Sequence, residues 1–246
     1  MPKDILEKYF YPELVTKAQE QNPFLKLNEL VYKLLATAIL TSGLPPGTRL
    51  NIVRIAQLLN VSRTPVADAM DQLVKEGLVV TSPTRKGHYV FDLSHSSLEQ
   101  LFMARKALEG TAAYICARQN TLVELGEMNQ LAERFAQVFE TGDFEHFSEL
   151  DQDFHNLVIT SCRNTYITKM YSVLKQFISY YSIRSQEYML SLHGDPSLAI
   201  LSCQHMSIYR AIELGLPDMA ESASKAHLDT CYNFCMRYHT TQGNIL

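Results

Sequence analysis

The feature that most constrains the fold is a change of hydrophobic periodicity within residues 26–91. Apolar residues first recur at helical spacing and then give way to two short strand-like runs. The helical segments cover residues 27–39, 52–59 and 62–74, and the strand-like runs cover residues 78–81 and 88–91. A helix, a helix–turn–helix at about residues 51–70 and a two-stranded hairpin therefore follow one another, which predicts a winged helix–turn–helix.

The rest of the chain shows only helical periodicity. Turn-forming residues separate six segments, at roughly 97–118, 121–141, 143–162, 164–190, 197–214 and 217–239. They predict an all-α bundle of about six helices over residues 98–246, a size usual for one domain. Residues 92–97 are expected to be a short polar linker, and residues 1–25 an N-terminal extension of unassigned role. The fold class is therefore mostly α.

Charge is divided unevenly along the chain. The formal net charge is −4, yet residues 26–91 hold eight basic and four acidic residues, so this module carries +4 and the remainder −8. A basic module joined to an acidic one predicts two domains with different partners.

The composition also bears on the cellular compartment. No apolar run is long enough for a membrane helix, and the first residues lack the pattern of a signal peptide. Five cysteines without framework spacing indicate reduced thiols. Cys231 and Cys235 lie one helical turn apart and fit core positions better than ligand positions. We expect a cytoplasmic protein that has no membrane partner.

The start of the second helix of the helix–turn–helix carries groups that suit DNA. Ser62, Arg63 and Thr64 offer hydroxyls, a guanidinium and free backbone amides to a phosphate or a major-groove base edge. A helix cap and a solvated charge would explain them equally well in isolation. A second basic feature, however, lies at the expected hairpin tip, formed by Arg85, Lys86, Gly87 and His88. Together they favour double-stranded DNA as a partner, with Arg63 contacting a guanine.

Several ordered motifs in this module resemble the N-terminal domain of GntR-family bacterial transcription regulators. The resemblance spans about 65 residues and is carried by Leu44-Pro45-Pro46-Gly47-Thr48-Arg49-Leu50, Val61-Ser62-Arg63-Thr64-Pro65-Val66 and Glu76-Gly77-Leu78-Val79. It adds Arg49 to the expected DNA-contacting residues. The chain departs from the family at Ile52, Val53, Ala67 and Asp68, where charged residues are usual. The operator sequence therefore does not follow from the resemblance.

The helical remainder resembles the FCD ligand-binding domain of the FadR subfamily. The matching residues are Arg105-x-x-Leu108-Glu109, Asp151-x-x-Phe154-His155, Asn164, His205 and Ala226-His227-Leu228. The resemblance implies a homodimeric regulator, most commonly a repressor, that reads a palindromic operator and responds to a small carboxylate metabolite.

A candidate metal site consists of one carboxylate and three imidazoles. Asp151 and His155 share one face of a helix, because they are four residues apart. His205 and His227 lie on two later helices. By spacing alone, separate surface or core histidines are the more common explanation. The resemblance implies that these four residues hold a divalent ion, with zinc first and nickel, manganese or iron as alternatives.

Arg105 is a candidate effector-binding residue. It shares the apolar inner face of its helix with Leu101 and Leu108, where a charge is unfavourable unless it is paired. One interpretation is a structural salt bridge with Glu109 or Asp151. The other, favoured by the resemblance, is a bidentate contact with the carboxylate of an effector, with Asn164 orienting the site.

Two other functions remain open from the sequence. A metal with open coordination positions could activate water in a hydrolase-type enzyme, although no general base or nucleophile motif is visible, so no enzyme is expected. Alternatively, the protein could bind DNA without any effector. The identities of the effector, metal, operator and regulated genes, and the direction of regulation, do not follow from the sequence.

Overall fold

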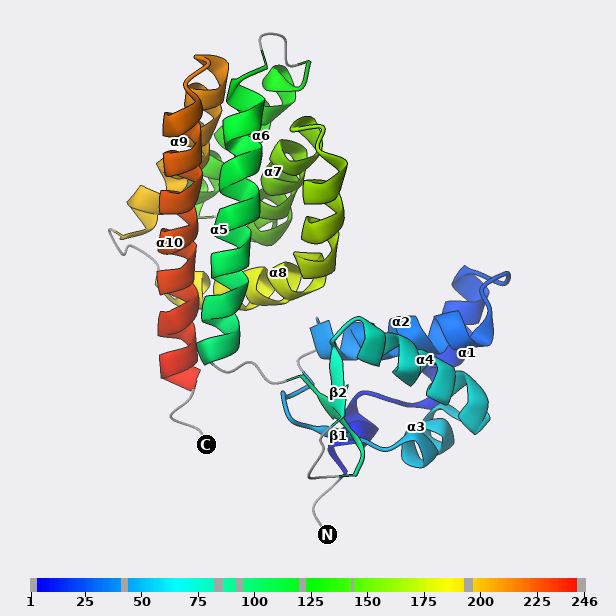
Figure 1. Ribbon diagram of the computed structural model, residues 1–246. Coiled ribbons are helices and arrows are strands. Elements are labelled where there is room, and N and C mark those ends of the chain that lie inside the picture. The colour runs from blue at the N-terminus through cyan, green and yellow to red at the C-terminus, as the bar shows by residue number, and fades with distance from the viewer. Residues whose placement is uncertain are drawn as a thin grey trace. The chain divides into compact units, whose positions relative to one another are not determined.

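A computed structural model describes residues 4–40, 44–81, 86–91, 95–119, 123–142, 144–192 and 197–242, without the side chains of residues 95–96, 184–191, 197 and 238–242. Its contacts divide the chain into two compact units, residues 1–93 and 94–246, each of which is described by itself (Figure 1). The first unit combines helices with a small sheet, and the second consists of helices.

The N-terminal unit is a winged helix–turn–helix. Its elements are the 3-10 turn η1 (Ile5–Lys8), helices α1 (Pro12–Gln21), α2 (Leu27–Leu40), α3 (Ile52–Leu59) and α4 (Arg63–Lys75), and strands β1 (Arg49–Leu50), β2 (Val79–Thr81) and β3 (His88–Val90). The sheet is antiparallel with the order β1-β3-β2, and Arg49 of β1 pairs with Tyr89. The expected two-stranded hairpin is present as β2 and β3, and β1 adds a third strand to it. Because β1 has only two residues, it leaves no alternating pattern in the sequence.

The helix–turn–helix follows from local capping and buried apolar faces. The side chain of Asn51 accepts a hydrogen bond from the Arg54 amide at 3.1 Å and caps α3. Asn60 ends α3 with a left-handed backbone (φ 53°), which asparagine tolerates better than most residues. Helix α4 packs against both α2 and α3, and Leu35, Ile55 and Met70 are fully buried.

The N-terminal extension is an integral part of this unit. Leu6, Phe10 and Val15 are buried, and α1 packs against α2 and α3. Asp4 lies 2.8 Å from the guanidinium of Arg54 on α3, and Glu7 pairs with the same guanidinium. The extension therefore adds apolar surface and two ion pairs to the unit.

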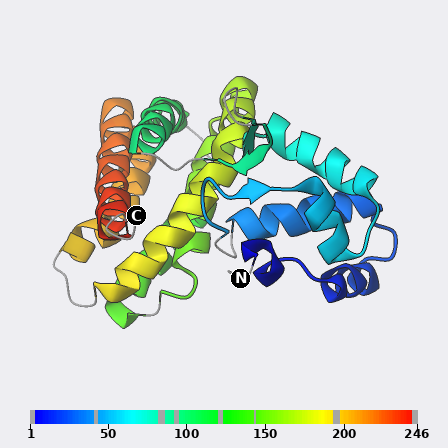
Figure 2. The ribbon, with the colours of Figure 1, turned by 90° about the horizontal axis from the view of Figure 1, so that it is seen from below.

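The C-terminal unit consists, in its described part, of six helices, as expected. They are α5 (His95–Ala117), α6 (Leu125–Thr141), α7 (Phe147–Ser161), α8 (Thr165–Ser191), α9 (Ser197–Glu213) and α10 (Pro217–Gln242). Helix α5 begins at His95, whereas the expected linker extends to residue 97. Helix α10 packs along α5 and α9, while α8 runs across their direction and contacts α5, α7 and α10 (Figures 1 and 2). No helix in the described ranges combines the length and hydropathy that crossing a membrane requires.

Among the described residues, the charged side chains buried in the core of this bundle lie close together. A group of charged and polar residues is buried among aromatic and aliphatic side chains, and it includes Arg105, Glu109, Asp151, His155, His205 and His227. Buried charge is unfavourable unless it is paired or binds a metal ion, so this group is the candidate functional site.

Replacement of Phe10 tests the structural role of the extension. Phe10 is fully buried, so Phe10→Ala is expected to destabilise the N-terminal unit by about 3–5 kcal/mol. Phe24→Ala is a matched control, because Phe24 is 97% exposed. Scanning calorimetry of both full-length variants measures the difference. Equal unfolding temperatures for the two variants would contradict an integral extension.

Candidate metal centre and DNA-binding surface

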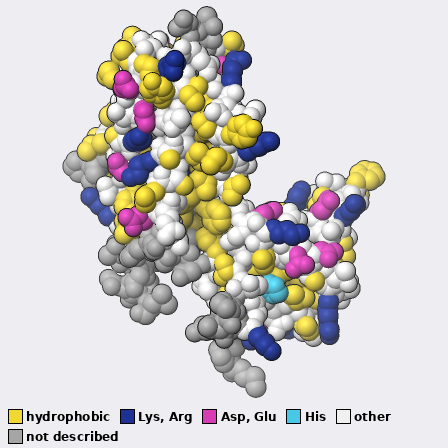
Figure 3. Space-filling view, in the orientation of Figure 1, with side chains coloured by type: hydrophobic (Ala, Val, Ile, Leu, Met, Phe, Trp, Pro, Cys, Tyr) yellow, Lys and Arg dark blue, Asp and Glu magenta, His cyan; other side chains and the backbone are white. Residues whose placement is uncertain are grey.

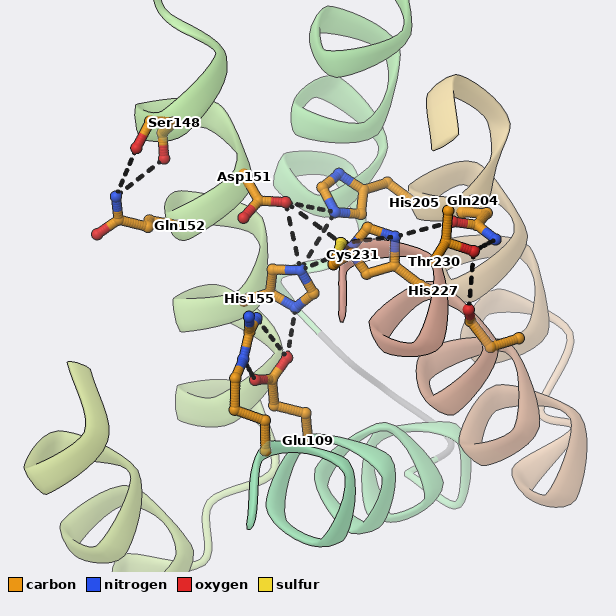
Figure 4. Close-up of polar contacts among 12 residues, drawn as sticks. Glu109, Ser148, Asp151, Gln152, His155, Gln204, His205, His227, Thr230 and Cys231 are labelled. Atoms are coloured by element: carbon orange, nitrogen blue, oxygen red, sulfur yellow. Dashed lines mark hydrogen bonds and ion pairs between the residues drawn. The ribbon is translucent and has the colours of Figure 1, made fainter. Parts of the chain in front are cut away.

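Three helices direct the four predicted ligands toward a common point. Asp151 and His155 lie one turn apart on α7, His205 comes from α9, and His227 comes from α10. All four side chains are at least 93% buried. Figure 4 shows the carboxylate and the three imidazoles facing one another. The structure therefore brings together all four predicted ligands, although they are spread over 77 residues of sequence.

The donor atoms are as close as the ligands of one metal ion. Oδ1 of Asp151 lies 3.6, 3.4 and 3.7 Å from Nε2 of His155, His205 and His227 respectively. Nε2 of His155 lies 3.0 Å from Nε2 of His227 and 3.3 Å from Nε2 of His205. Bonds of about 2.0–2.1 Å to zinc would place neighbouring donors about 3.0–3.4 Å apart. The donor set thus fits a divalent ion without large rearrangement.

The environment of Asp151 also fits a cation. Its Oδ1 is buried and has no hydrogen-bond partner within the part of the chain that the structure describes. Burial alone would raise the pKa of this carboxyl group, but the neighbouring histidines outweigh burial and hold the pKa well below its usual range. An ionised oxygen that faces three nitrogens and lacks a hydrogen-bond donor is suited to a metal ion.

Glu109 orients the first histidine and was not among the predicted site residues. Its Oε2 lies 2.7 Å from Nδ1 of His155, so this nitrogen holds a proton toward the carboxylate and leaves Nε2 toward the other donors. Its Oε1 lies 2.6 Å from Nε of Arg105. Despite burial, Arg105 and His155 lower the pKa of Glu109 to about 2. Sequence reasoning considered Glu109 only as a salt-bridge partner of Arg105.

A second chain of contacts orients His227. Its Nδ1 lies 3.2 Å from Oε1 of Gln204, the amide of Gln204 donates to Oγ1 of Thr230 at 2.9 Å, and Thr230 donates to the carbonyl of Ala226. These contacts fix the ring so that Nε2 faces the cluster. Gln204 was not among the residues predicted for the site. Its position beside His205 is the one signal in the sequence that could have indicated this role.

The protonation states follow from burial and neighbouring charges. Burial disfavours charge on His155, but Glu109 and Asp151 outweigh it and raise its pKa to about 9. Burial lowers the pKa of His205 to about 3 and also lowers that of His227. At neutral pH the metal-free site thus contains one charged and two neutral imidazoles.

A small cavity of about 20 Å³ adjoins the cluster. Its walls include Asp151 and Arg105 as well as Phe102, Phe147, Tyr181, Ser182, Cys231 and Cys235. This volume is close to that of one water molecule. Arg105 lines the cavity, but its guanidinium is already paired with Glu109, which is the salt-bridge interpretation left open by the sequence.

The structure gives Asn164 a local role instead of a place in this cluster. Its Oδ1 accepts hydrogen bonds from the amides of Tyr166 and Ile167, at 3.0 and 3.2 Å, and so caps α8. The expectation that Asn164 orients the effector site stays a prediction beside this capping role.

The start of α4 presents the expected DNA-contacting groups to solvent. Ser62, Arg63 and Thr64 are all exposed. Ser62 occupies the N-cap position, but its side chain makes no capping hydrogen bond. Its hydroxyl and the first amides of α4 therefore remain available to an anion or a base edge.

The wing brings Arg49 beside the hairpin tip. Nη2 of Arg49 donates to the carbonyl oxygen of Lys86 at 3.5 Å. A Cβ on Gly87 would lie 3.2 Å from Nε of Arg49. Gly87 also has a positive φ of 137°, which side-chain-bearing residues rarely adopt. Lys86 is exposed and His88 is half-buried at the start of β3. Arg85 lies outside the described residues.

Two family descriptions match the two units. "Bacterial regulatory proteins, gntR family" matches residues 27–90, and "FCD domain" matches residues 100–230. The matched residues include the start of α4, the wing and all four clustered donors. Both expectations of resemblance are thereby confirmed, as is the expectation that the protein is no enzyme.

Characterised relatives are similar over much of the chain. The HTH-type transcriptional repressor RspR of Escherichia coli (strain K12) is 28% identical over 216 residues, which are 87% of this chain and 91% of the relative. The Nta operon transcriptional regulator of Aminobacter aminovorans is 29% identical over 126 residues, or 50% of this chain and 58% of the relative. Both relatives are named as regulators of transcription.

Solved structures share the fold. McbR/YncC of E. coli superposes with a TM-score of 0.64 at 19% identity, covering 87% of this chain and 99% of that one. Lar, which controls the expression of the Listeria monocytogenes agr system, superposes with a TM-score of 0.58 at 18% identity and covers 88% and 99%. From the matched families, the winged helix–turn–helix and the helical bundle, we conclude that this chain belongs to the gntR family of bacterial DNA-binding transcription regulators and carries a C-terminal FCD domain.

Proposed function

We propose that this protein is a cytoplasmic, homodimeric repressor that holds a divalent metal ion and releases a palindromic operator when a small carboxylate binds beside that ion. The observation that carries the metal part is the convergence of Asp151 with three Nε2 atoms within 3.4–3.7 Å. The donors suit zinc, nickel, manganese or iron, with zinc preferred. The bound ion would supply positive charge and open coordination positions.

The charge balance of the cluster supports an anionic effector. With a divalent ion bound and His155 neutral, Glu109 and Asp151 offset Arg105 and one charge of the ion. About one positive charge then remains in a buried, low-dielectric site, and a carboxylate would neutralise it. The 20 Å³ cavity holds only a water-sized group, so the cavity walls must move apart to admit the effector.

Exposed apolar side chains support the homodimer. Tyr166, Met170 and Val173 follow one another at intervals of four and three residues on α8 and are 76%, 58% and 63% exposed. This spacing puts them on one helix face. Figure 3 shows hydrophobic side chains gathered on the surface of the C-terminal unit. A second copy that covered such a face would place two DNA-reading units on one symmetric operator.

A panel of small organic and sugar acids tests the effector part. The operator is first identified by sequencing the genomic fragments that the purified protein retains. With zinc-loaded protein, we expect one class of acid to raise the unfolding temperature of the protein and to release it from this operator. His205→Ala should abolish both responses, because it removes one metal donor. If no acid acts while the operator is still bound, the effector-independent DNA binder is the better description.

Replacement of Arg63 tests the reading of DNA by α4. Arg63→Ala is expected to weaken binding to the recovered operator by about 1–3 kcal/mol, or roughly 5- to 150-fold, and to relax specificity at one base pair. Lys75→Ala is the control, since Lys75 is exposed at the other end of the same helix. Fluorescence anisotropy at fixed salt gives both affinities. An equal loss in the two variants would contradict a specific role for Arg63.

Replacement of Glu109 tests the contact that orients His155. Glu109→Gln removes the negative charge that faces Nδ1, and divalent-metal affinity is expected to fall about 10- to 100-fold. Glu221→Gln serves as the control, because Glu221 pairs with Lys225 at the surface. Competition with a chromophoric chelator measures both affinities. Unchanged zinc affinity in Glu109→Gln would argue against this orienting role.

Metal binding should release protons at neutral pH. His155 has a pKa of about 9 in the metal-free protein, so it is charged at pH 7 and must lose the Nε2 proton to bind a cation. Asp151, His205 and His227 need to release no net proton, because their lowered pKa values leave the carboxylate ionised and both imidazoles neutral at pH 7. We expect the protein to release at least one proton for each zinc ion that it binds at pH 7, and its zinc affinity to rise toward pH 9. Calorimetry in buffers of different ionisation enthalpy counts the protons, and a count of zero would contradict the assignment.

A further inference from the structure

Cys231 lies against the metal-facing side of His227. Its Sγ is 3.4 Å from Nε2 of His227 and 4.0 Å from Nδ1, so the sulfur is nearer to the nitrogen that faces the other donors. Figure 4 draws this sulfur and its contact with the ring of His227. Cys231 also lines the cavity together with Asp151. The thiol therefore borders the cluster on the side of the cavity.

The spacing of these residues repeats on two helices. Helix α7 presents Asp151 and His155 four residues apart, and α10 presents His227 and Cys231 at the same interval. Residues one turn apart lie on the same face of a helix. Each helix can thus direct a pair of donors to the same centre, whereas α9 contributes His205 and the supporting Gln204.

The neighbouring cysteine provides a contrast. Cys235 also lines the cavity, but it lies one further turn along α10, about 6 Å farther from His227 along the helix axis. Sγ of Cys231 lies within 4.0 Å of a clustered imidazole. The two cysteines that look equivalent in the sequence are therefore different in the fold.

We propose that Cys231 is a fifth protein donor to the metal ion and that its sulfur directs the site toward zinc-like ions. The proposal rests on the metal centre of the proposed function. As the sulfur–metal bond forms, the thiol proton passes to solvent and the sulfur lone pair becomes the bonding pair. Thiolate favours zinc and other borderline or soft ions over manganese and magnesium. A thiolate on the cavity side would also offset the one positive charge that remains at the Asp/His centre and leave fewer coordination positions, so the effector carboxylate and the sulfur would compete for the ion.

Cobalt(II) is a direct probe of this sulfur, because thiolate bonded to cobalt gives an intense near-ultraviolet charge-transfer absorption that imidazole and carboxylate do not give. Titration of the metal-free full-length protein with cobalt(II) is expected to produce this band with one equivalent of metal. Cys231→Ser should lose the band while still binding cobalt. Cys235→Ser, the matched control, should keep it.

A second readout uses the metal preference. Cys231→Ser is expected to lose on the order of tenfold or more in zinc affinity while manganese affinity changes little, because manganese gains little from sulfur. Circular dichroism of Cys231→Ser and Cys231→Ala establishes that the helical fold is retained. If Cys231→Ser alone were misfolded, the metal affinities would be compared in Cys231→Ala.

The outcomes separate this inference from the proposed function. Stoichiometric cobalt binding without the sulfur band, or a band that persists in Cys231→Ser, would overturn the role of Cys231 and leave the Asp/His centre in place. Absence of cobalt, zinc and manganese binding in the unmodified protein would overturn both. Loss of the band in Cys231→Ser, with cobalt still bound and Cys235→Ser unaffected, would support the fifth donor.

Discussion

The C-terminal unit depends on the pairing of charges that its helices bury together. Glu109 lies between Arg105 on its own helix and His155 on α7, and both contacts are shorter than 3 Å. Removing such charges from water costs several kcal/mol for each ion unless partners compensate. The same contacts that compensate these charges also hold α5 against α7. The charges can therefore be paired only when α5 and α7 pack in this arrangement.

The metal centre extends this network to α9 and α10. His205 and His227 reach Asp151 across the bundle, and Gln204 links α9 to α10 through its contacts with His227 and Thr230. A metal ion held by these donors would join three helices at one point. An effector bound beside the ion could change operator affinity only by as much as its own affinity differs between two arrangements of the protein. A site shared by several helices is well placed to produce such a difference.

Local patterns were enough to predict most of the elements. The winged helix–turn–helix and the six-helix bundle follow from periodicity, and the four clustered donors follow from residues that match the family motif. The errors lie where local signals are short or absent. Strand β1 has two residues and forms only because Arg49 and Leu50 pair with β3. The packing of Phe10 likewise depends on surfaces of the unit that no local pattern describes.

The helical segments, the basic module and the residue types available for chemistry can be read from the amino-acid sequence, because they depend on neighbours within one or two helical turns. The partners that those residues meet become visible only once the helices are packed together. Arg105 pairs with Glu109, Asn164 caps α8, and Cys231 borders the imidazole of His227. The physical reason is that these contacts depend on how helices distant in sequence are rotated and spaced, and a change of about one ångström decides whether two polar atoms bind.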